Sequence, residues 1–278
     1  MLELTVLVEN KSGRDDLFPA NGLSFLFEDG DERILFDTGP DETFLTNAKI
    51  LGVSLEDITN VVLSHGHYDH AGGIPALASF LEKAEVRPNL ICHPDWMVER
   101  YVGTSVVGKQ MNFKKLDAGL DMASVSSCFN LIESREPYKI GSRFTFLGEI
   151  PRSKKFKGGG PFGVVKDGDT YKDDYLYDDT GIVWEGEEGL VIITGCSHSG
   201  ICNVIEKAQA VTGVKNIAAI VGGLHLRTAS VAHLYEVRSF LKKMNVKRSF
   251  ACHCTGKWGI AWLPDNQTIC TGSKITFV

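Results

Sequence analysis

The residues with the clearest chemical potential form a short cluster, His65-x-His67-x-Asp69-His70. Residues two apart in an extended segment project to the same side, so His65 and His67 can bind one metal ion together. The chain then turns, and Asp69 and His70 face a second position, as a two-metal site requires. A solvated histidine-rich loop is the alternative, but the apolar run Val61–Leu63, typical of a buried strand, leads directly into the cluster. The spacing therefore predicts a site for divalent ions.

Three further histidines, His198, His225 and His253, each stand in a loop that follows an apolar, strand-like segment. Loops at strand ends are where α/β folds place their ligands. Imidazole suits zinc, iron and related ions, whereas the carboxylate of Asp69 supplies a hard oxygen ligand. We therefore expect these loops to meet the first cluster in space.

Seven cysteines, an odd number, are present, and none of them forms a CxxC pair. This pattern argues against a disulfide framework and against a structural zinc knuckle. Most of the thiols are expected to be small buried hydrophobic groups. Three cysteines differ from the others because each lies close to a histidine in the sequence. Cys196 is near His198, and Cys252 and Cys254 are on either side of His253.

The elements that must position these residues alternate between strands and helices. Apolar patterning predicts strands over 2–9, 23–28, 33–37, 61–63, 90–92, 138–140, 143–147, 190–194, 217–221, 249–252 and 275–278. Helical spacing is found over 42–51, 75–83, 201–211 and 231–242. Apart from the strands at 138–140 and 143–147, residues 102–175 are predicted to be irregular. Because each half combines strands with strand–helix units, we expect a single domain over 1–278, a four-layer αββα sandwich.

Composition excludes several classes of protein. The 278 residues are 43% hydrophobic, which suits a folded domain rather than a disordered chain. The net charge is −6, and the densest basic run, Arg152–Lys157, is short, so no nucleic acid partner is expected. No apolar stretch approaches a membrane span, and the start of the chain does not look like an export signal. We therefore expect a cytoplasmic protein without a membrane partner.

The motif His65–His70 after Val61–Ser64 resembles the HxHxDH signature of the metallo-β-lactamase superfamily, and Leu35–Gly39 resembles the strand before it, which ends in a buried aspartate. Further segments are similar to one subgroup, named for the 7,8-dihydropterin-6-methyl-(ribofuranosyl)aminobenzene 5′-phosphate synthase of methanopterin assembly. These segments are Val6–Asn10, Gly22–Phe25, Asn47–Val53, Gly148–Arg152, Thr194–Ile201, Gly222–Leu226 and Cys252–Gly256.

The resemblance implies roles for residues outside the first cluster. His198 corresponds to the third histidine of the first ion, and His253 to the late histidine of the second ion. Asp37 corresponds to a carboxylate behind the ligands that accepts an imidazole N–H and so fixes its tautomer. The alternatives are histidines bonded to the backbone and a surface aspartate. The implied cofactor is one or two divalent ions, zinc first, with iron, manganese or magnesium as alternatives.

One position departs from the superfamily pattern. Thr194-Gly195 leads to Cys196, where most two-metal members have a bridging aspartate. A thiolate can bind a soft ion, but we expect Cys196 to be a packed thiol behind the ligands, which leaves the second site weaker. His225 either reaches the metals or binds substrate, and either Asp69 or His225 could carry the proton in catalysis.

Arg152, with Lys154, Lys155 and Lys157 nearby, suggests an anionic substrate, because a planar guanidinium matches phosphate geometry. A solvated basic loop is the alternative. Trp258 follows His253 closely and could stack on a flat ring, although it could equally belong to the core or the rim.

The function predicted from these residues is a metal-dependent hydrolase, or a transferase that displaces a phosphoryl or pyrophosphoryl group. Its partner would be a small, anionic, pterin-like molecule, and a homo-oligomer is allowed. A non-catalytic metal sensor is one alternative. A di-iron redox enzyme is another, but such enzymes need more carboxylate ligands and a further flavodoxin-like domain, for which this chain is too short.

Overall fold

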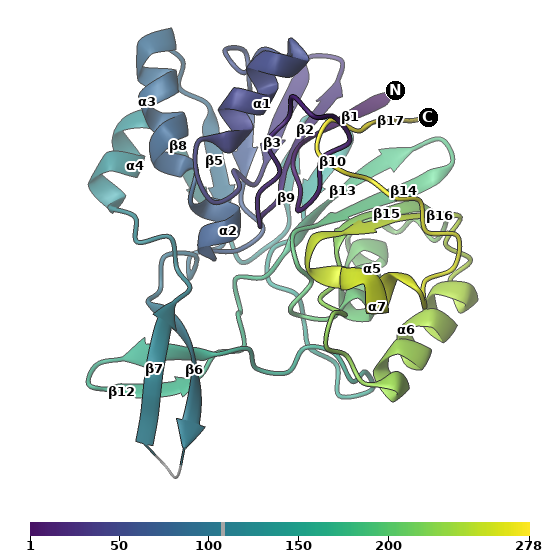
Figure 1. The fold of residues 1–278 in the computed structure, drawn as a ribbon. Helices are drawn as coiled ribbons and strands as arrows, with labels where there is room; N and C mark the ends of the chain where they lie inside the picture. Colours follow the sequence, from purple (N-terminus) through teal and green to yellow (C-terminus); the bar gives the residue numbers. More distant parts are fainter. Residues whose placement is uncertain (107–108) are drawn as a thin grey trace.

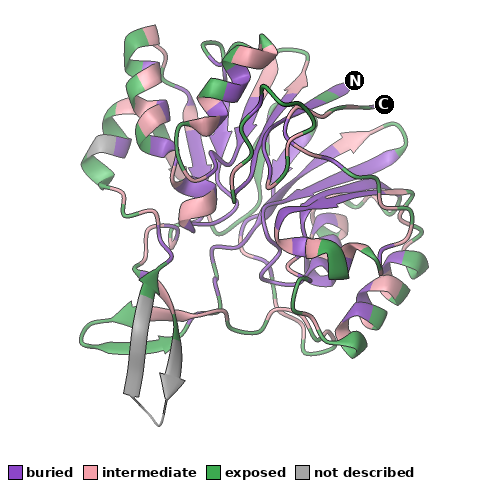
Figure 2. Ribbon diagram, in the orientation of Figure 1, coloured by how far each residue is buried: buried purple, intermediate pink, exposed green. Residues whose placement is uncertain are grey.

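The computed structural model describes residues 1–106 and 109–278, in which two β-sheets face each other and helices cover both outer sides (Figure 1). This arrangement confirms the predicted αββα sandwich. In Figure 2 the sheets are largely buried, whereas the helices present exposed residues to the outside.

The first sheet contains the strand that leads into the histidine cluster. Its strands lie in the order β17 (Lys274–Phe277), β1 (Leu2–Val8), β2 (Ser24–Asp29), β3 (Glu32–Phe36), β4 (Asn60–Val62), β5 (Asn89–Cys92) and β8 (Asn130–Glu133). The pairs from β17 to β3 are antiparallel, and those from β3 to β8 are parallel. Because β3 and β4 are parallel neighbours, the loops that follow them, with Asp37 and His65, begin side by side.

The second sheet carries the other histidine loops. Its strands lie in the order β16 (Arg248–Cys252), β15 (Ile217–Gly223), β14 (Gly189–Thr194), β13 (Gly181–Gly186), β10 (Phe144–Phe146) and β9 (Tyr138–Ile140). Strands β14, β15 and β16 are parallel. The loops that carry His198, His225 and His253 therefore leave one edge of this sheet together.

Apolar side chains hold the layers together. The residues between the sheets form one cluster, which includes Phe25, Phe144 and Trp184. A second cluster fixes α1 (Thr43–Leu51), α3 (Ile74–Ala84) and α4 (Met122–Cys128) on the first sheet. A third fixes α5 (Ile201–Thr212) and α6 (Val231–Lys243) on the second sheet. The short helices α2 (Tyr68–Ala71), η1 (His253–Thr255) and α7 (Gly256–Ile260) follow strand ends at the site.

The expectation that residues 102–175 are mostly irregular is wrong. They contribute to a four-stranded sheet in the order β12 (Thr170–Asp173), β11 (Val164–Asp167), β6 (Arg100–Val106) and β7 (Lys109–Lys115), which extends from the sandwich (Figure 1). All of β12 is exposed, so this strand lacks the alternation of apolar and polar residues from which a strand is predicted. Helix α4 and strand β8 also lie in this segment. No helix in the described residues has the length and apolar character needed to cross a membrane.

Candidate metal centre

The first group of ligands combines the loop after β4 with the loop after β14. Nε2 of His65 lies 3.1 Å from Nδ1 of His67, and the ring centroid of His198 is 5.0 Å from that of His65 and 5.1 Å from that of His67. Nε2 of His67 and Nε2 of His198 are buried without a hydrogen-bond partner in the described structure. Burying an unpartnered imidazole nitrogen is costly unless an ion binds there, so these residues fit a metal ion.

The second group lies beside the first and includes the carboxylate of Asp69. Oδ2 of Asp69 is 3.6 Å from Nε2 of His253, and its Oδ1 is 4.0 Å from Nε2 of His70. The sulfur of Cys196 is 3.3 Å from the same nitrogen of His70. The ligand atoms of His70, Cys196 and His253 lie within 4.8 Å of one another, as donors to one ion would.

Hydrogen bonds on the opposite ring nitrogens fix which nitrogen of each histidine faces the ions. Nδ1 of His70 donates to Asp37 Oδ2 at 2.7 Å. Ser64 Oγ donates to Asp37 Oδ2 at 2.7 Å, so it accepts from Nδ1 of His65 at 2.9 Å. Nδ1 of His253 donates to Asn10 Oδ1 at 2.8 Å. With Nδ1 as the donor in the neutral form of these three rings, Nε2 is the nitrogen that faces the ions, which is the arrangement that ligand histidines adopt.

Burial keeps most of these histidines neutral, the form that binds metal. Burial and neighbouring histidines hold the pKa values of His65, His67 and His198 well below the ordinary value. Burial and the charge of His70 lower the pKa of His253 to about 3. For His70, burial also lowers the pKa, but the carboxylates of Asp37 and Asp69 outweigh it and raise the pKa to about 9. Without an ion, His70 therefore carries a proton at neutral pH.

Three buried carboxylates that the sequence reading missed anchor the ligand loops through backbone N–H groups. Asp178 Oδ2 accepts from Gly66 N at 2.8 Å. Asp179 accepts from the backbone of His198 at 2.9 Å and of Ser199 at 2.8 Å. Glu9 Oε1 accepts from the backbone of His253 at 2.9 Å. The adjacent pair of aspartates just before β13 is the only signal in the sequence that could have pointed to two of them.

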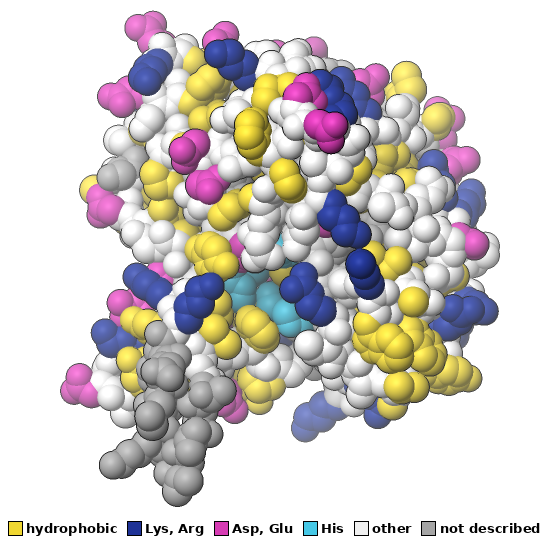
Figure 3. All heavy atoms as spheres, in the orientation of Figure 1, with side chains coloured by type: hydrophobic (Ala, Val, Ile, Leu, Met, Phe, Trp, Pro, Cys, Tyr) yellow, Lys and Arg dark blue, Asp and Glu magenta, His cyan; other side chains and the backbone are white. Residues whose placement is uncertain are grey.

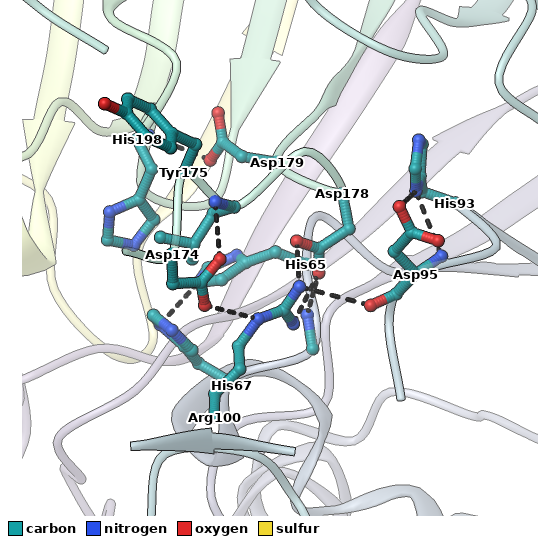
Figure 4. A network of polar contacts seen from close by, with 12 residues as sticks. His65, His67, His93, Asp95, Arg100, Asp174, Tyr175, Asp178, Asp179 and His198 are labelled. Atoms are coloured by element: carbon teal, nitrogen blue, oxygen red, sulfur yellow. Dashed lines mark hydrogen bonds and ion pairs between the residues drawn. The ribbon is translucent and has the colours of Figure 1, made fainter. Parts of the chain in front are cut away.

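A buried arginine joins the small sheet to this anchoring system. Arg100, at the start of β6, is 1% exposed and donates to both oxygens of Asp178, at 2.9 and 2.5 Å (Figure 4). Its Nε donates to Asp174 Oδ2 at 2.8 Å. A paired, bidentate guanidinium offsets the cost of burying these charges. The small sheet is thereby fixed to the loop that carries His65 and His67.

The backbone at the site adopts conformations that are unfavourable for most residues. Asp37, Ser197, His225 and His253 have φ angles of +57°, +56°, +48° and +50°. Non-glycine residues with positive φ are uncommon, and such strain is typical of functional sites. Gly66 is required for a different reason, because a Cβ there would lie 1.6 Å from the carbonyl oxygen of Trp96.

The ligand groups open into a cavity of about 230 Å³. Its lining residues are Asn21, His67, Tyr68, Asp69, Leu116, Phe162, Cys196, His198, His225, Arg227, Thr228, His253 and Cys254. In Figure 3 the histidines lie at the bottom of a hollow with lysine and arginine side chains around it. The cavity is therefore small, polar at its base and basic at its rim.

The structure brings the predicted ligands together but places the predicted substrate contacts elsewhere. Arg152 Nη2 donates to the carbonyl groups of Tyr175 and Leu176, at 2.6 Å for Leu176, and Arg152 does not line the cavity. Trp258 is 49% exposed, donates to Ala229 O at 3.3 Å and does not line the cavity either. Arg227, which the sequence reading passed over, is the basic residue at the cavity.

Three comparisons relate the chain to known proteins. Residues 17–202 match the profile of the Metallo-beta-lactamase superfamily. An uncharacterized protein of Methanocaldococcus jannaschii is 31% identical, over 91% of this chain and 90% of its own length. The 7,8-dihydropterin-6-methyl-4-(beta-D-ribofuranosyl)-aminobenzene-5'-phosphate synthase of the same organism is 29% identical, over 92% of this chain and 88% of its own length. The crystal structure of Tm1679, described as a metal-dependent hydrolase of the beta-lactamase superfamily, superposes with a TM-score of 0.83 at 26% identity and covers 100% and 99% of the two chains.

Proposed function

The chain belongs to the metallo-beta-lactamase superfamily, as its motifs predicted, and from this premise we propose that it is a metal-dependent enzyme that cleaves or displaces a phosphoryl or pyrophosphoryl group of a small anionic substrate. The observation that carries the proposal is the pair of ligand groups at the base of one cavity. His65, His67 and His198 would hold one ion, and Asp69, His70 and His253 the other.

Bound divalent ions, zinc first among them, would act as Lewis acids and lower the pKa of water, which is the chemistry of two-metal hydrolases. The donor set suits such ions, because neutral imidazoles and one carboxylate face the positions from a buried surface.

Two residues at the cavity would move protons in this reaction. The carboxylate of Asp69 is 17% exposed and lines the cavity, so its oxygens can accept a proton there. Nδ1 of His225 is buried without a hydrogen-bond partner in the described structure, and the His225 ring centroid is 4.3 Å from that of His198. Both groups can reach a substrate held over the ligands, which is the first geometric requirement of a general acid or base.

Arg227 supports the choice of an anionic substrate. It lines the cavity, and its Nη2 lies 3.3 Å from the carbonyl oxygen of His253, which draws the guanidinium toward the proposed ligands. A guanidinium matches phosphate oxygens in geometry as well as in charge. The relation to a synthase whose name contains a pterin and a ribofuranosyl phosphate makes such molecules the first substrates to test.

The test is hydrolysis by the full chain, chelated and then reloaded with one metal at a time, on phosphomonoesters, phosphodiesters, pyrophosphates, lactones and thioesters. We expect metal-dependent release of phosphate or pyrophosphate, and its loss in Asp69→Asn. Turnover that survives chelation, or tight metal binding with no turnover on any substrate, would contradict the proposal, and the second result would favour the sensor.

Arg227→Ala is expected to raise KM for the anionic substrate more than it lowers kcat. Lys154→Ala, at an exposed basic residue outside the cavity, is the matched control and should leave both constants unchanged. Equal effects of the two substitutions would remove Arg227 from substrate recognition.

A further inference from the structure

A third group of metal-binding atoms lies beside the two proposed ions and is rich in sulfur. The sulfurs of Cys196 and Cys254 and one ring nitrogen of His225 lie within 4.8 Å of one another. Each residue follows a different strand, namely β14, β15 and β16, which are parallel neighbours in the second sheet. This group therefore assembles from the loops at one end of the second sheet, and it shares Cys196 with the histidine groups of His65 and His70.

Local contacts hold the Cys254 sulfur at the centre of the group. It accepts the backbone N–H of His225 at 3.3 Å and lies 3.7 Å from the carbonyl oxygen of Cys196. A Cβ on Gly223 would lie 2.6 Å from this sulfur, so only glycine leaves room for it. Two separate segments, at Cys196 and at Gly223–His225, thus surround the Cys254 sulfur at the cavity wall.

The imidazole of His225 is in turn available as a ligand. Its Nδ1 is buried and has no hydrogen-bond partner in the described part of the chain. Its backbone has a φ of +48°, a conformation that directs the side chain to the cavity at a cost in free energy. Cys254 and His225 therefore both face the space next to Cys196.

We propose that Cys196, His225 and Cys254 form a third metal position, specific for a thiophilic divalent ion such as zinc or cadmium. Donor atoms around a tetrahedral zinc with Zn–S near 2.3 Å and Zn–N near 2.0 Å are roughly 3.5–3.8 Å apart. The observed atoms, within 4.8 Å, reach this spacing through small side-chain rotations. The cavity supplies the fourth, open position.

The second sulfur, that of Cys254, distinguishes this position from the other two, with which it shares Cys196. Thiolate ligands select soft ions, whereas carboxylate and water ligands suit magnesium and manganese. An ion there would also occupy His225, which the proposed function uses for proton transfer, so we expect the position to fill only when metal exceeds two equivalents. The inference goes beyond the proposed function, because it concerns binding and needs no turnover.

The test is a cadmium titration of the full chain, freed of metal and kept reduced, that counts bound ions by equilibrium dialysis and follows the ultraviolet thiolate-to-cadmium absorption. We expect Cys254→Ser to bind one ion fewer than the wild type and to lose at least half of the absorption. Cys202→Ser, at a buried cysteine of α5 outside the cavity, is the matched control and should behave like the wild type.

Unchanged stoichiometry and absorption in a folded Cys254→Ser protein would overturn the proposal. Should that variant fail to fold, X-ray absorption of the wild type loaded with three equivalents of cadmium decides instead. The proposal requires sulfur neighbours around the metal that appear with the third equivalent and are absent with manganese. Only nitrogen and oxygen neighbours would refute it. Neither readout depends on the hydrolysis assay, so the two proposals can fail separately.

Discussion

Replacing Asp37 by asparagine should weaken binding of the second ion by about 10–100-fold, the usual cost of changing a carboxylate behind a ligand histidine. The carboxylate of Asp37 receives three donors: Oδ1 accepts Ser64 N at 2.8 Å, and Oδ2 accepts Ser64 Oγ and His70 Nδ1, both at 2.7 Å. An asparagine amide has one oxygen, so at least one donor would face its NH₂ group. Losing one hydrogen bond to a charged group costs about 1.5–3 kcal/mol, and about 1.4 kcal/mol corresponds to tenfold in affinity.

The substitution isolates the carboxylate, since asparagine has almost the same shape and tolerates positive φ as aspartate does, which matters at a φ of +57°. Zinc affinity would be measured by competition with a chelator of known affinity, and thermal unfolding of the metal-free protein would confirm that the variant folds. Asp57→Asn, at an exposed carboxylate, is the control. Wild-type affinity for both ions in folded Asp37→Asn protein would show that the hydrogen bonds from Ser64 and His70 to Asp37 do not support metal binding.

The remaining predictions concern single ligands and pH. His67→Ala should lose the first ion and His253→Ala the second, as measured by metal analysis after dialysis, and wild-type stoichiometry in both would reject the assignment. Cys196→Ser should lower metal content, because its sulfur lies beside His70 and is a proposed ligand of the third position, whereas unchanged metal content with a small loss of stability would identify a packed thiol and contradict that position. In metal-free protein the lowered pKa of His253 contributes stability above pH 6.5 that is lost as pH falls toward about 3. The raised pKa of His70 acts in the opposite sense and contributes stability below pH 6.5 that is lost as pH rises through about 9. Chemical denaturation of chelated protein across this range should therefore show falling stability on the acid side, and a flat profile would contradict the pKa directions.

The sequence predicts most of the sandwich, because strands buried on both faces leave continuous apolar runs such as Leu190–Thr194. It also predicts the histidines of the site, because each stands directly after such a run. The small sheet escaped prediction because strands like Thr170–Asp173 are exposed and pair only with one another.

The anchoring carboxylates escaped for another reason. Glu9 and Asp179 accept hydrogen bonds from backbone N–H groups of loops that are remote in sequence. Because almost every residue type has a backbone N–H, the sequence does not show which residue donates. The substrate contacts could not be predicted either, because the sequence does not show which basic residue faces the cavity. Local sequence favoured Arg152, whose guanidinium instead binds the carbonyl groups of Tyr175 and Leu176.

The most direct test of the proposed metal centre is anomalous X-ray scattering from crystals of protein purified without chelator. We expect two peaks at the base of the cavity, one among His65, His67 and His198 and one among Asp69, His70 and His253. Crystals that contain metal elsewhere, with no peak at either position, would contradict this expectation.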